Sequence, residues 1–224
     1  MNSPIIATLV AFALVAAAPP PAALQPALVA DAKALVPAAL AFERATRTTA
    51  TDGKETKVET RLDRWDGKTW SLVSIDGKPA TPEASVKWNK DRAGKPVPSY
   101  HRLAQLLGGS ARQATDASGA TVLMLDALPP GSIDISGDRS DEFAAEAIVD
   151  TSGTRPWVRR FHAHARAPFR IMIVGKIDRF DLVSDYALDP SGHPMLVHQI
   201  QDYAGSGPGQ SGSVRTESTY RALR

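Results

Sequence analysis

The feature that most constrains the fold is a series of Asp-Gly-Lys turns between short segments of alternating polar and apolar residues. The turns occur at 52–54, 66–68 and 76–78. An Asp-Gly pair between alternating segments is a strong signal for a tight β-hairpin, because both residues tolerate a positive φ. The sequence therefore predicts an antiparallel meander whose strands span residues 42–50, 55–65 and 69–75.

The same pattern of short strands and polar turns continues to the C-terminus. The further predicted strands lie at about 111–117, 120–127, 143–150, 157–165, 169–174, 177–188, 194–203 and 213–222, with a glycine-rich joint at 205–212. Regular strand spacing of this kind is typical of one curved antiparallel sheet or an incomplete β-barrel. No internal repeat and no Pro- or Ser-rich linker divides the sequence, so we expect a single, mainly β (α+β) domain.

Helical patterns occur at three places. Thr81-Pro82-Glu83 supplies an N-cap, a first helical proline and an acidic first turn, and so predicts a helix over 82–92. A second short helix is predicted at 99–107, where two glycines follow. An alanine-rich segment at 26–41 predicts an N-terminal helix interrupted near Pro37. We expect the two short helices to lie on the concave side of the sheet.

The N-terminus has the pattern of a secretory signal. Residues 1–30 carry no charged side chain, and an apolar stretch from Ile5 to Ala18 ends at three prolines. This stretch is shorter than the roughly 20 residues of a membrane-spanning helix, and small residues at its end are typical of a cleavage site. We therefore predict a signal peptide over residues 1–24, with cleavage between 18 and 32. The mature protein would be soluble, periplasmic or otherwise exported, and without a transmembrane span.

Composition excludes several classes of function. The chain of 224 residues has no cysteine, so it has no disulfide framework, no cysteine nucleophile and no thiolate metal site. A cysteine-linked lipid anchor is excluded for the same reason. The 26 basic and 24 acidic residues nearly cancel, and the small excess does not indicate a nucleic-acid-binding protein.

Few residues have the spacing of a chemical site. His162 and His164 are two positions apart on a predicted strand, so their imidazoles would share a face about 7 Å apart and could bind a metal with His198 or Asp202. The arginines around them disfavour a bound cation and predict cross-strand pairs with the acids of the following strand. No Gly-x-Ser-x-Gly motif and no phosphate-binding loop is present. We expect no cofactor and no catalysis, and keep a metal-dependent activity at His162 and His164 as an alternative.

Alternation along the strands identifies apolar side chains for the inner face of the curved sheet. An ordinary core and an apolar ligand cavity share this pattern, so both interpretations stay open. The candidate ligand-cavity residues are Leu62, Trp70, Leu72, Leu123, Leu125, Phe161, Ile171, Ile173, Phe180 and Leu182.

The order of these elements also resembles a known family. The resemblance lies in the meander with Trp65 and Trp70, the two inserted helices, and a set of later segments. Those segments are Trp157-Val158-Arg159, Ala167-Pro168-Phe169-Arg170, Phe180-Asp181-Leu182-Val183-Ser184-Asp185-Tyr186, Leu188-Asp189-Pro190-Ser191-Gly192-His193-Pro194 and Ser218-Thr219-Tyr220-Arg221. Over most of residues 40–222 the chain resembles the periplasmic LolA/LolB-like half-barrel superfamily, which includes lipoprotein carriers and the N-terminal domain of RseB.

The resemblance implies a single half-barrel domain over residues 25–224, with helices on its concave side and an apolar cavity for acyl chains. It also implies an arginine that contacts the lid, for which we select Arg44 on the first predicted strand. We therefore expect an envelope protein that binds or carries a lipid or a lipoprotein acyl chain when the two short helices shift. The alternatives are an envelope interaction or sensor module without lipid cargo, whose partner is another envelope protein, and the metal-dependent activity.

Overall fold

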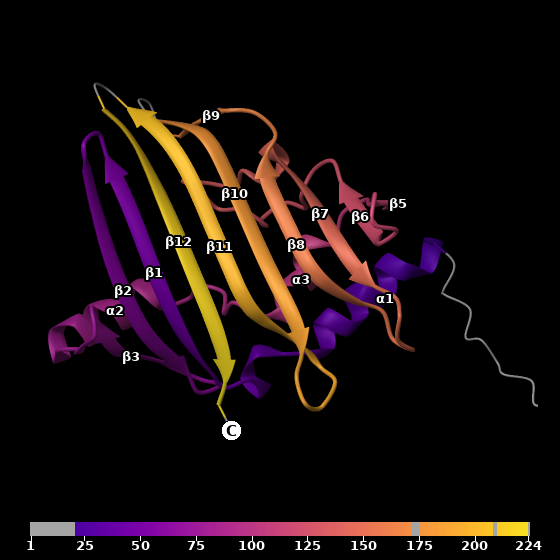
Figure 1. Ribbon diagram of the computed structural model, residues 1–224, viewed down its shortest axis with the longest axis horizontal. Helices are drawn as coiled ribbons and strands as arrows, with labels where there is room; N and C mark the ends of the chain where they lie inside the picture. The colour runs from indigo at the N-terminus through magenta and orange to yellow at the C-terminus, as the bar shows by residue number, and fades with distance from the viewer. Residues whose placement is uncertain (1–20, 172–174, 208–209, 224) are drawn as a thin grey trace, which may run out of the picture.

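The computed structural model describes residues 21–171, 175–207 and 210–223. In this part of the chain, twelve strands form one antiparallel sheet in the order β4-β3-β2-β1-β12-β11-β10-β8-β7-β6-β5, and β9 pairs with β10. The sheet is open, with β4 and β5 at opposite edges. Figure 1 shows β2 and β3 at one end of the sheet and β5 at the other. The prediction of a mainly β fold with one antiparallel sheet is confirmed, and the sheet does not close into a barrel.

The strands follow the predicted segments closely. They are β1 (Phe42–Asp52), β2 (Glu55–Trp65), β3 (Trp70–Ile75), β4 (Lys78–Pro79), β5 (Arg112–Thr115), β6 (Thr121–Leu125), β7 (Phe143–Asp150), β8 (Trp157–Ala165), β9 (Phe169–Ile171), β10 (Gly175–Leu188), β11 (Pro194–Gly207) and β12 (Gln210–Ala222). The prediction that residues 205–212 form a joint between two strands is wrong for most of that segment, because β11 and β12 pair along it. Glycine is needed there for close packing of strands: a Cβ at Gly205 would lie 2.6 Å from the Lys176 carbonyl oxygen.

Three α-helices and three short 3₁₀ helices accompany these strands in the described residues. They are α1 (Pro21–Ala34), α2 (Pro82–Arg92), α3 (Leu103–Leu106), η1 (Pro37–Ala39), η2 (Tyr100–Arg102) and η3 (Ser140–Glu142). Helix α2 has the predicted bounds, and its Thr81 N-cap accepts a hydrogen bond from the Ala84 N–H at 3.2 Å. The helix predicted at 99–107 is instead a 3₁₀ turn followed by the short α3.

The N-terminal helix starts earlier than the sequence pattern predicts. The boundary at residue 24 that we drew between signal peptide and domain falls inside α1. Leu24, Leu28 and Ala32 share one face of α1 at helical spacing and are fully or almost fully buried. Removal of residues up to 24 would therefore delete part of a packed helix. The rest of the predicted signal peptide, residues 1–20, lies outside the described residues.

The helices lie on one side of the sheet, behind it in Figure 1. Helices α1 and α3 lie behind the β10–β7 region, and α2 lies behind β2 and β3 at the other end. Helix α1 packs on η2 and α3, which cover the apolar side chains of the sheet. Register shifts between β2 and β3, β7 and β8, and β10 and β11 mark β-bulges, which bend strands and increase their twist.

The structure corrects the predicted inner face of β2. Asp63 and Trp65 are buried on the side of the helices. Leu62 points to the opposite face because side chains alternate along a strand, and it pairs with Ser74, whereas Asp63 pairs with Leu72. The prediction that Leu62 lines the concave face is therefore wrong. Alternation identified the two faces, but the covered face of β2 carries a buried ion pair instead of the aliphatic residues.

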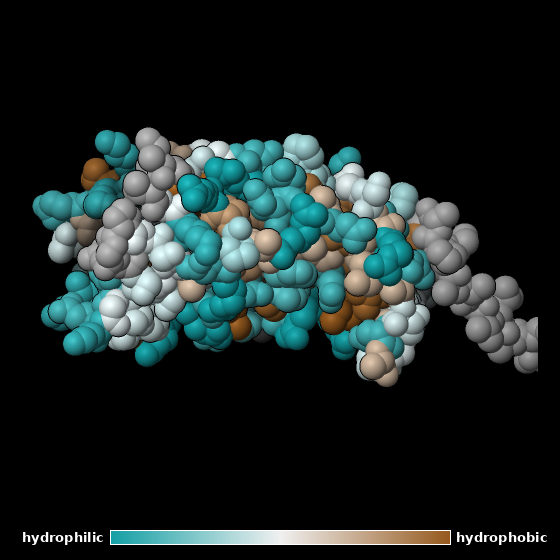
Figure 2. All heavy atoms as spheres, turned by 90° about the horizontal axis from the view of Figure 1, so that it is seen from above, coloured by the Kyte–Doolittle hydropathy of each residue, from teal (hydrophilic) through white to brown (hydrophobic). Residues whose placement is uncertain are grey.

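The outer surface is mainly hydrophilic. Seen from above, hydrophobic residues appear in separate patches among hydrophilic ones (Figure 2). The exposed large hydrophobic residues lie on different elements and are Val36, Val58, Val86 and Leu188. Within residues 21–171, 175–207 and 210–223, no helix has the length and apolar character needed to cross a membrane.

Candidate ligand-binding site

A cavity of about 580 Å³ lies on the concave side of the sheet, against β10 and β11. Its volume is within the range of roughly 300–1,000 Å³ that is typical of small-molecule sites. The strands contribute Leu182, Ser184, Tyr186, Leu196, Gln199 and Gln201. The covering residues come from the segment between α2 and α3, from Leu106 and from the loop at 131–134. We call this space the central cavity.

The lining of the central cavity is divided between apolar and polar groups. Leu106, Ile133, Leu182 and Leu196 supply aliphatic surface. Gln199 supplies polar groups. Its Nε2 donates to Ser184 Oγ at 3.0 Å, and its Oε1 accepts from the Tyr220 hydroxyl at 3.4 Å. These bonds fix the Gln199 amide against the sheet. The sheet side of the cavity, which we call its floor, therefore carries a row of polar groups.

Cations gather at the covering side of the central cavity. Arg92, Lys95 and Arg102 line it together with one carboxylate, that of Asp134. Arg102 donates to Gln105 Oε1 at 2.5 Å and to the Ser132 carbonyl oxygen at 3.4 Å, which fixes its guanidinium. Burial lowers the pKa of Arg102 from its ordinary value. The cavity is therefore amphipathic, with a net positive rim.

The polar surface extends from the floor of the cavity across the neighbouring strands. Thr46 and Ser218 hydroxyls lie 3.0 Å apart on β1 and β12, and Thr48 and Thr216 hydroxyls lie 3.5 Å apart in the same pairing. The concave face is thus apolar and filled under α3, and hydroxyl-rich on β12 and β1.

The structure does not bring the predicted cavity residues into one space. Leu123, Leu125 and Phe161 are at most 2% exposed and belong to the filled core. Phe180 is also buried, with its ring 5.2 Å from that of Phe143. Of the predicted residues that the structure describes, Leu182 alone lines the central cavity.

The remaining predicted residues are dispersed. Trp70 lines a separate hollow between β3 and α2, and the buried Leu72 lies on the same face of β3. Ile171 lines another hollow beside β10 and β11. Ile173 lies outside the described residues. The prediction of a single apolar cavity lined by all these residues is therefore not matched by the geometry.

Sequence reasoning missed the residues that make the central cavity amphipathic. Gln199 and Gln201 were detectable in principle, because they alternate on one predicted strand and so must share a face. The rim residues Arg92, Lys95 and Arg102 had no such signal. They come together only because the segment between α2 and α3 folds back over β10 and β11.

Arg44 lies beneath α2 in a buried ion pair. Its Nε and Nη2 donate to the two carboxylate oxygens of Asp63 at 3.0 and 2.8 Å, and the two side chains are 5% and 0% exposed. The Arg44 guanidinium carbon lies 4.5 Å from the Trp70 ring centroid and 6.0 Å from that of Trp88, a residue of α2. Arg44 thus lies beside Trp88 of α2, and its role as a lid contact stays a prediction.

Two more arginines stack on the same tryptophan of α2. The guanidinium carbons of Arg61 and Arg92 lie 4.6 and 4.4 Å from the Trp88 ring centroid. Such cation–π contacts each stabilise by about 0.5–2 kcal/mol, depending on burial. We call Arg44, Arg61, Arg92, Trp70 and Trp88 the arginine–tryptophan cluster. It attaches α2 to the sheet where an apolar core would otherwise be expected.

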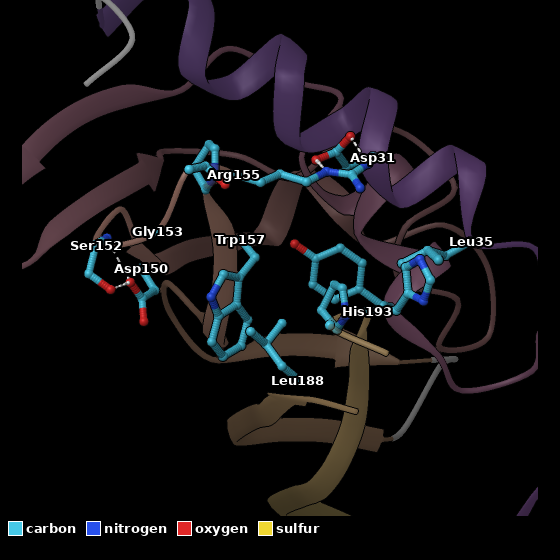
Figure 3. Close-up of a pocket in the computed structure, with 14 residues that line it drawn as sticks. Asp31, Leu35, Asp150, Ser152, Gly153, Arg155, Trp157, Leu188 and His193 are labelled. Atoms are coloured by element: carbon cyan, nitrogen blue, oxygen red, sulfur yellow. Dashed lines mark hydrogen bonds and ion pairs between the residues drawn. The ribbon is translucent and has the colours of Figure 1, made fainter. Parts of the chain in front are cut away.

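A smaller pocket of about 290 Å³ lies between α1 and the β7–β8 and β10–β11 hairpins (Figure 3). Arg155 closes one side by donating to both Asp31 carboxylate oxygens at 2.7 and 2.5 Å. Tyr100 forms another wall: its hydroxyl accepts from the Val158 N–H at 2.9 Å, and burial raises its pKa to about 12. The Tyr100 ring packs edge to face on Tyr186, with centroids 5.2 Å apart. This aromatic pair separates the smaller pocket from the central cavity.

The histidine pair lies on the convex face. The rings of His162 and His164 are 5.3 Å apart, as expected for residues that share a face, and His162 Nε2 lies 3.1 Å from Asp181 Oδ1. His198, one predicted third ligand, contacts Asp185 and Glu217 instead. In the described ranges, no group of three or more His, Asp or Glu is arranged to hold a metal ion.

The predicted pairing between the arginine-rich and acidic strands is confirmed at one position in particular. Arg160 of β8 and Asp185 of β10 are register partners, and Arg160 Nε lies 2.5 Å from Asp185 Oδ1. Asp202, the other predicted metal ligand, pairs with Arg179 and Arg215. These side chains are part of a surface ion-pair network.

The central cavity and the arginine–tryptophan cluster are thus the features that could recognise a ligand. Comparisons with family models, curated proteins and solved structures give no match for this chain.

Proposed function

We propose that this protein binds or carries an amphiphilic ligand, a lipid or a lipoprotein acyl chain, in the central cavity without chemically changing it. The observation that carries this proposal is the divided lining of that cavity. Its aliphatic residues offer burial worth about 0.8 kcal/mol per methylene group. Arg92, Lys95 and Arg102 offer charge-assisted hydrogen bonds to an anionic head.

A purely apolar ligand fits this lining less well. Hydrocarbon laid over the half-buried amides of Gln199 and Gln201 would remove them from water and leave the hydrogen-bonding groups that are not paired within the protein without a partner. Each such loss costs about 1–3 kcal/mol. The ligand should therefore carry oxygen atoms that reach β11 as well as an apolar chain that lies against Leu182 and Leu196.

Export to the cell envelope belongs to the same proposal. It rests on the signal-like sequence of residues 1–24 and on the resemblance to half-barrel lipoprotein carriers. Opening would require movement of the segment between α2 and α3, which covers the cavity. Two alternatives remain: an envelope interaction or sensor module with no cargo, and metal-dependent chemistry at His162 and His164.

Native mass spectrometry of the protein purified gently from the periplasm distinguishes these three hypotheses. We expect a mass increase that corresponds to a bound lipid. A bound metal would favour the histidine alternative, and the bare mass of the chain would favour the interaction module.

A displacement assay with a fluorescent fatty acid tests the location. Leu182→Glu places a carboxylate on the apolar part of the floor and should weaken binding about tenfold or more, which corresponds to about 1.4 kcal/mol. Val58→Glu is the matched control, because it makes the same kind of change at an exposed position of β2. Full binding by Leu182→Glu would exclude the central cavity as the site.

A further inference from the structure

A hollow of about 350 Å³ lies between β3 and the C-terminal part of α2. Three cations line it, Lys68, Arg92 and Lys95, and its lining includes no carboxylate. Trp65 and Trp70 form one wall, and Asn89 contributes from α2. Arg92 and Lys95 also line the central cavity, but the other lining residues of the two spaces differ. We call this space the basic hollow.

Arg92 is the arginine of the cluster that has no counterion. Arg44 is paired with Asp63, and Arg61 Nε lies 2.8 Å from Glu59 Oε1. Across residues 21–171, 175–207 and 210–223, no carboxylate pairs with Arg92 and no acceptor takes a hydrogen bond from it. Its guanidinium carbon lies 4.4 Å from the Trp88 ring centroid and 6.0 Å from that of Trp70.

This stacking leaves the hydrogen-bonding edge of Arg92 available. A guanidinium contacts an indole through its flat face, whereas its N–H donors point outward in the plane of the group. The tryptophan rings therefore contact Arg92 without accepting conventional hydrogen bonds from its donors. Burial lowers the pKa of Arg92 to about 10, with the nearby Arg44 adding to this effect and Asp63 opposing it, so a direct anionic partner would stabilise its positive charge.

The carboxylates closest in sequence to Lys68 and Arg92 are those of Asp66 and Asp91, and both already have other partners. Asp66 Oδ1 accepts from the backbone N–H groups of Lys68 and Thr69 at 2.8 and 2.7 Å. Asp91 pairs with Lys87 at 2.8 Å on the exposed side of α2. The positive charges that line the basic hollow are therefore left without a direct partner.

We propose that the basic hollow binds a phosphate group. The N–H edge of Arg92 matches two phosphate oxygens in a bidentate arrangement, and Lys68 and Lys95 supply the flanking charges. The volume leaves room for a substituent on the phosphate beside Trp70. The phosphate could be free in solution or belong to a phospholipid headgroup. The phosphate site needs no ligand in the central cavity, but a ligand head bound there would compete for Arg92 and Lys95, which line both spaces.

Isothermal titration calorimetry with inorganic phosphate and with glycerol 3-phosphate tests the soluble source. Co-sedimentation with phosphatidylglycerol vesicles tests the headgroup source. We expect Arg92→Gln to weaken binding about tenfold or more, because it removes charge-assisted hydrogen bonds. Lys68→Gln should weaken it by a smaller factor. Lys54→Gln at the tip of the β1–β2 hairpin removes the same charge elsewhere and should leave binding unchanged.

Binding of soluble phosphates without vesicles would identify a free phosphate, and Arg92-dependent vesicle binding would identify a headgroup. No binding in either assay would overturn the proposal. An equal loss in Lys54→Gln would also overturn it, since the attraction would then be unspecific. Should Arg92→Gln fail to fold, Lys68→Gln and Lys95→Gln, both at exposed positions, test the site in its place. Unchanged phosphate binding by both variants would then overturn the proposal. Lys68 does not line the central cavity, so Lys68→Gln should keep fatty-acid binding and Leu182→Glu should keep phosphate binding.

Discussion

Under α3 the concave face of the sheet is filled with aliphatic and aromatic side chains, whereas under α2 it is occupied by arginines and tryptophans. Phe143 and Phe161, both 0% exposed, lie in the first region. The Arg44–Asp63 pair and Trp88 lie in the second. The same sheet therefore holds its helices by two kinds of interaction, one dominated by apolar burial and the other by directional polar and cation–π contacts.

The central cavity lies where these two regions meet. Leu182 and Leu196 continue the apolar region into the cavity, and Gln199 and Gln201 begin the polar one. A tightly packed core resists deformation, whereas the covering segment between α2 and α3 carries exposed side chains such as Lys95, whose contacts can be exchanged for contacts with water at little cost. On the proposal that the central cavity takes a ligand, the α3 region would keep the scaffold in place while the covering segment next to α2 moves.

The largest expected effect comes from the apolar region. Phe161→Ala removes a fully buried ring and leaves a cavity, so the free energy of unfolding should fall by about 4 kcal/mol. Urea unfolding followed by circular dichroism measures it. Leu188→Ala, at a site 48% exposed, should change stability by less than about 0.5 kcal/mol. A loss below about 1 kcal/mol at Phe161 would show that this region is not tightly packed and would restore it as a candidate ligand cavity.

The second effect comes from the polar region and has a different signature. Asp63→Asn leaves the Arg44 charge buried without its partner, so the free energy of unfolding should fall by about 3 kcal/mol. Replacing both residues, as Arg44→Met with Asp63→Leu, should recover much of the loss because no charge is then buried. The same urea titration on both variants checks this. If the double variant is no more stable than Asp63→Asn, the pair does more than neutralise charge, and the contrast with the apolar region weakens.

Local signals explain why much of the fold could be predicted from the sequence. Asp-Gly turns, the Thr81 cap and strict alternation depend on neighbouring residues only, and they located β2, α2, β7 and β8 with their observed bounds. The ends of β11 and β12 depend on pairing between distant strands. There Gly205 and Gly212 serve close strand contact and not a turn, which local composition does not reveal.

The candidate site was predicted less well because it depends on which face of each strand is covered. Alternation put Leu62 and Asp63 on opposite faces, but only the position of α2 decides that Asp63 is the buried one. Phe161 and Leu182 likewise share the apolar pattern. One lies under α3 in a filled core and the other beside an open space, and this difference arises from the path of residues 92–102 over the sheet.

The smallest of the three effects concerns the wall between the central cavity and the smaller pocket, where Tyr100 packs on Tyr186. Burial raises the pKa of both hydroxyls, that of Tyr100 to about 12, whereas an unfolded tyrosine titrates near 10. Below pH 10 both states keep the proton, and stability is unaffected. Between pH 10 and 12 the unfolded chain loses the Tyr100 proton first, so unfolding becomes easier by roughly 2 kcal/mol at pH 12.

Tyr100→Phe removes this contribution, although it also removes the acceptor for the Val158 N–H. Urea unfolding at pH 9, 10, 11 and 12 should therefore show a lower starting stability but a shallower alkaline decline in the variant. Parallel declines in the two proteins would mean that the Tyr100 hydroxyl is hydrated, and that the wall between the central cavity and the smaller pocket is open to water.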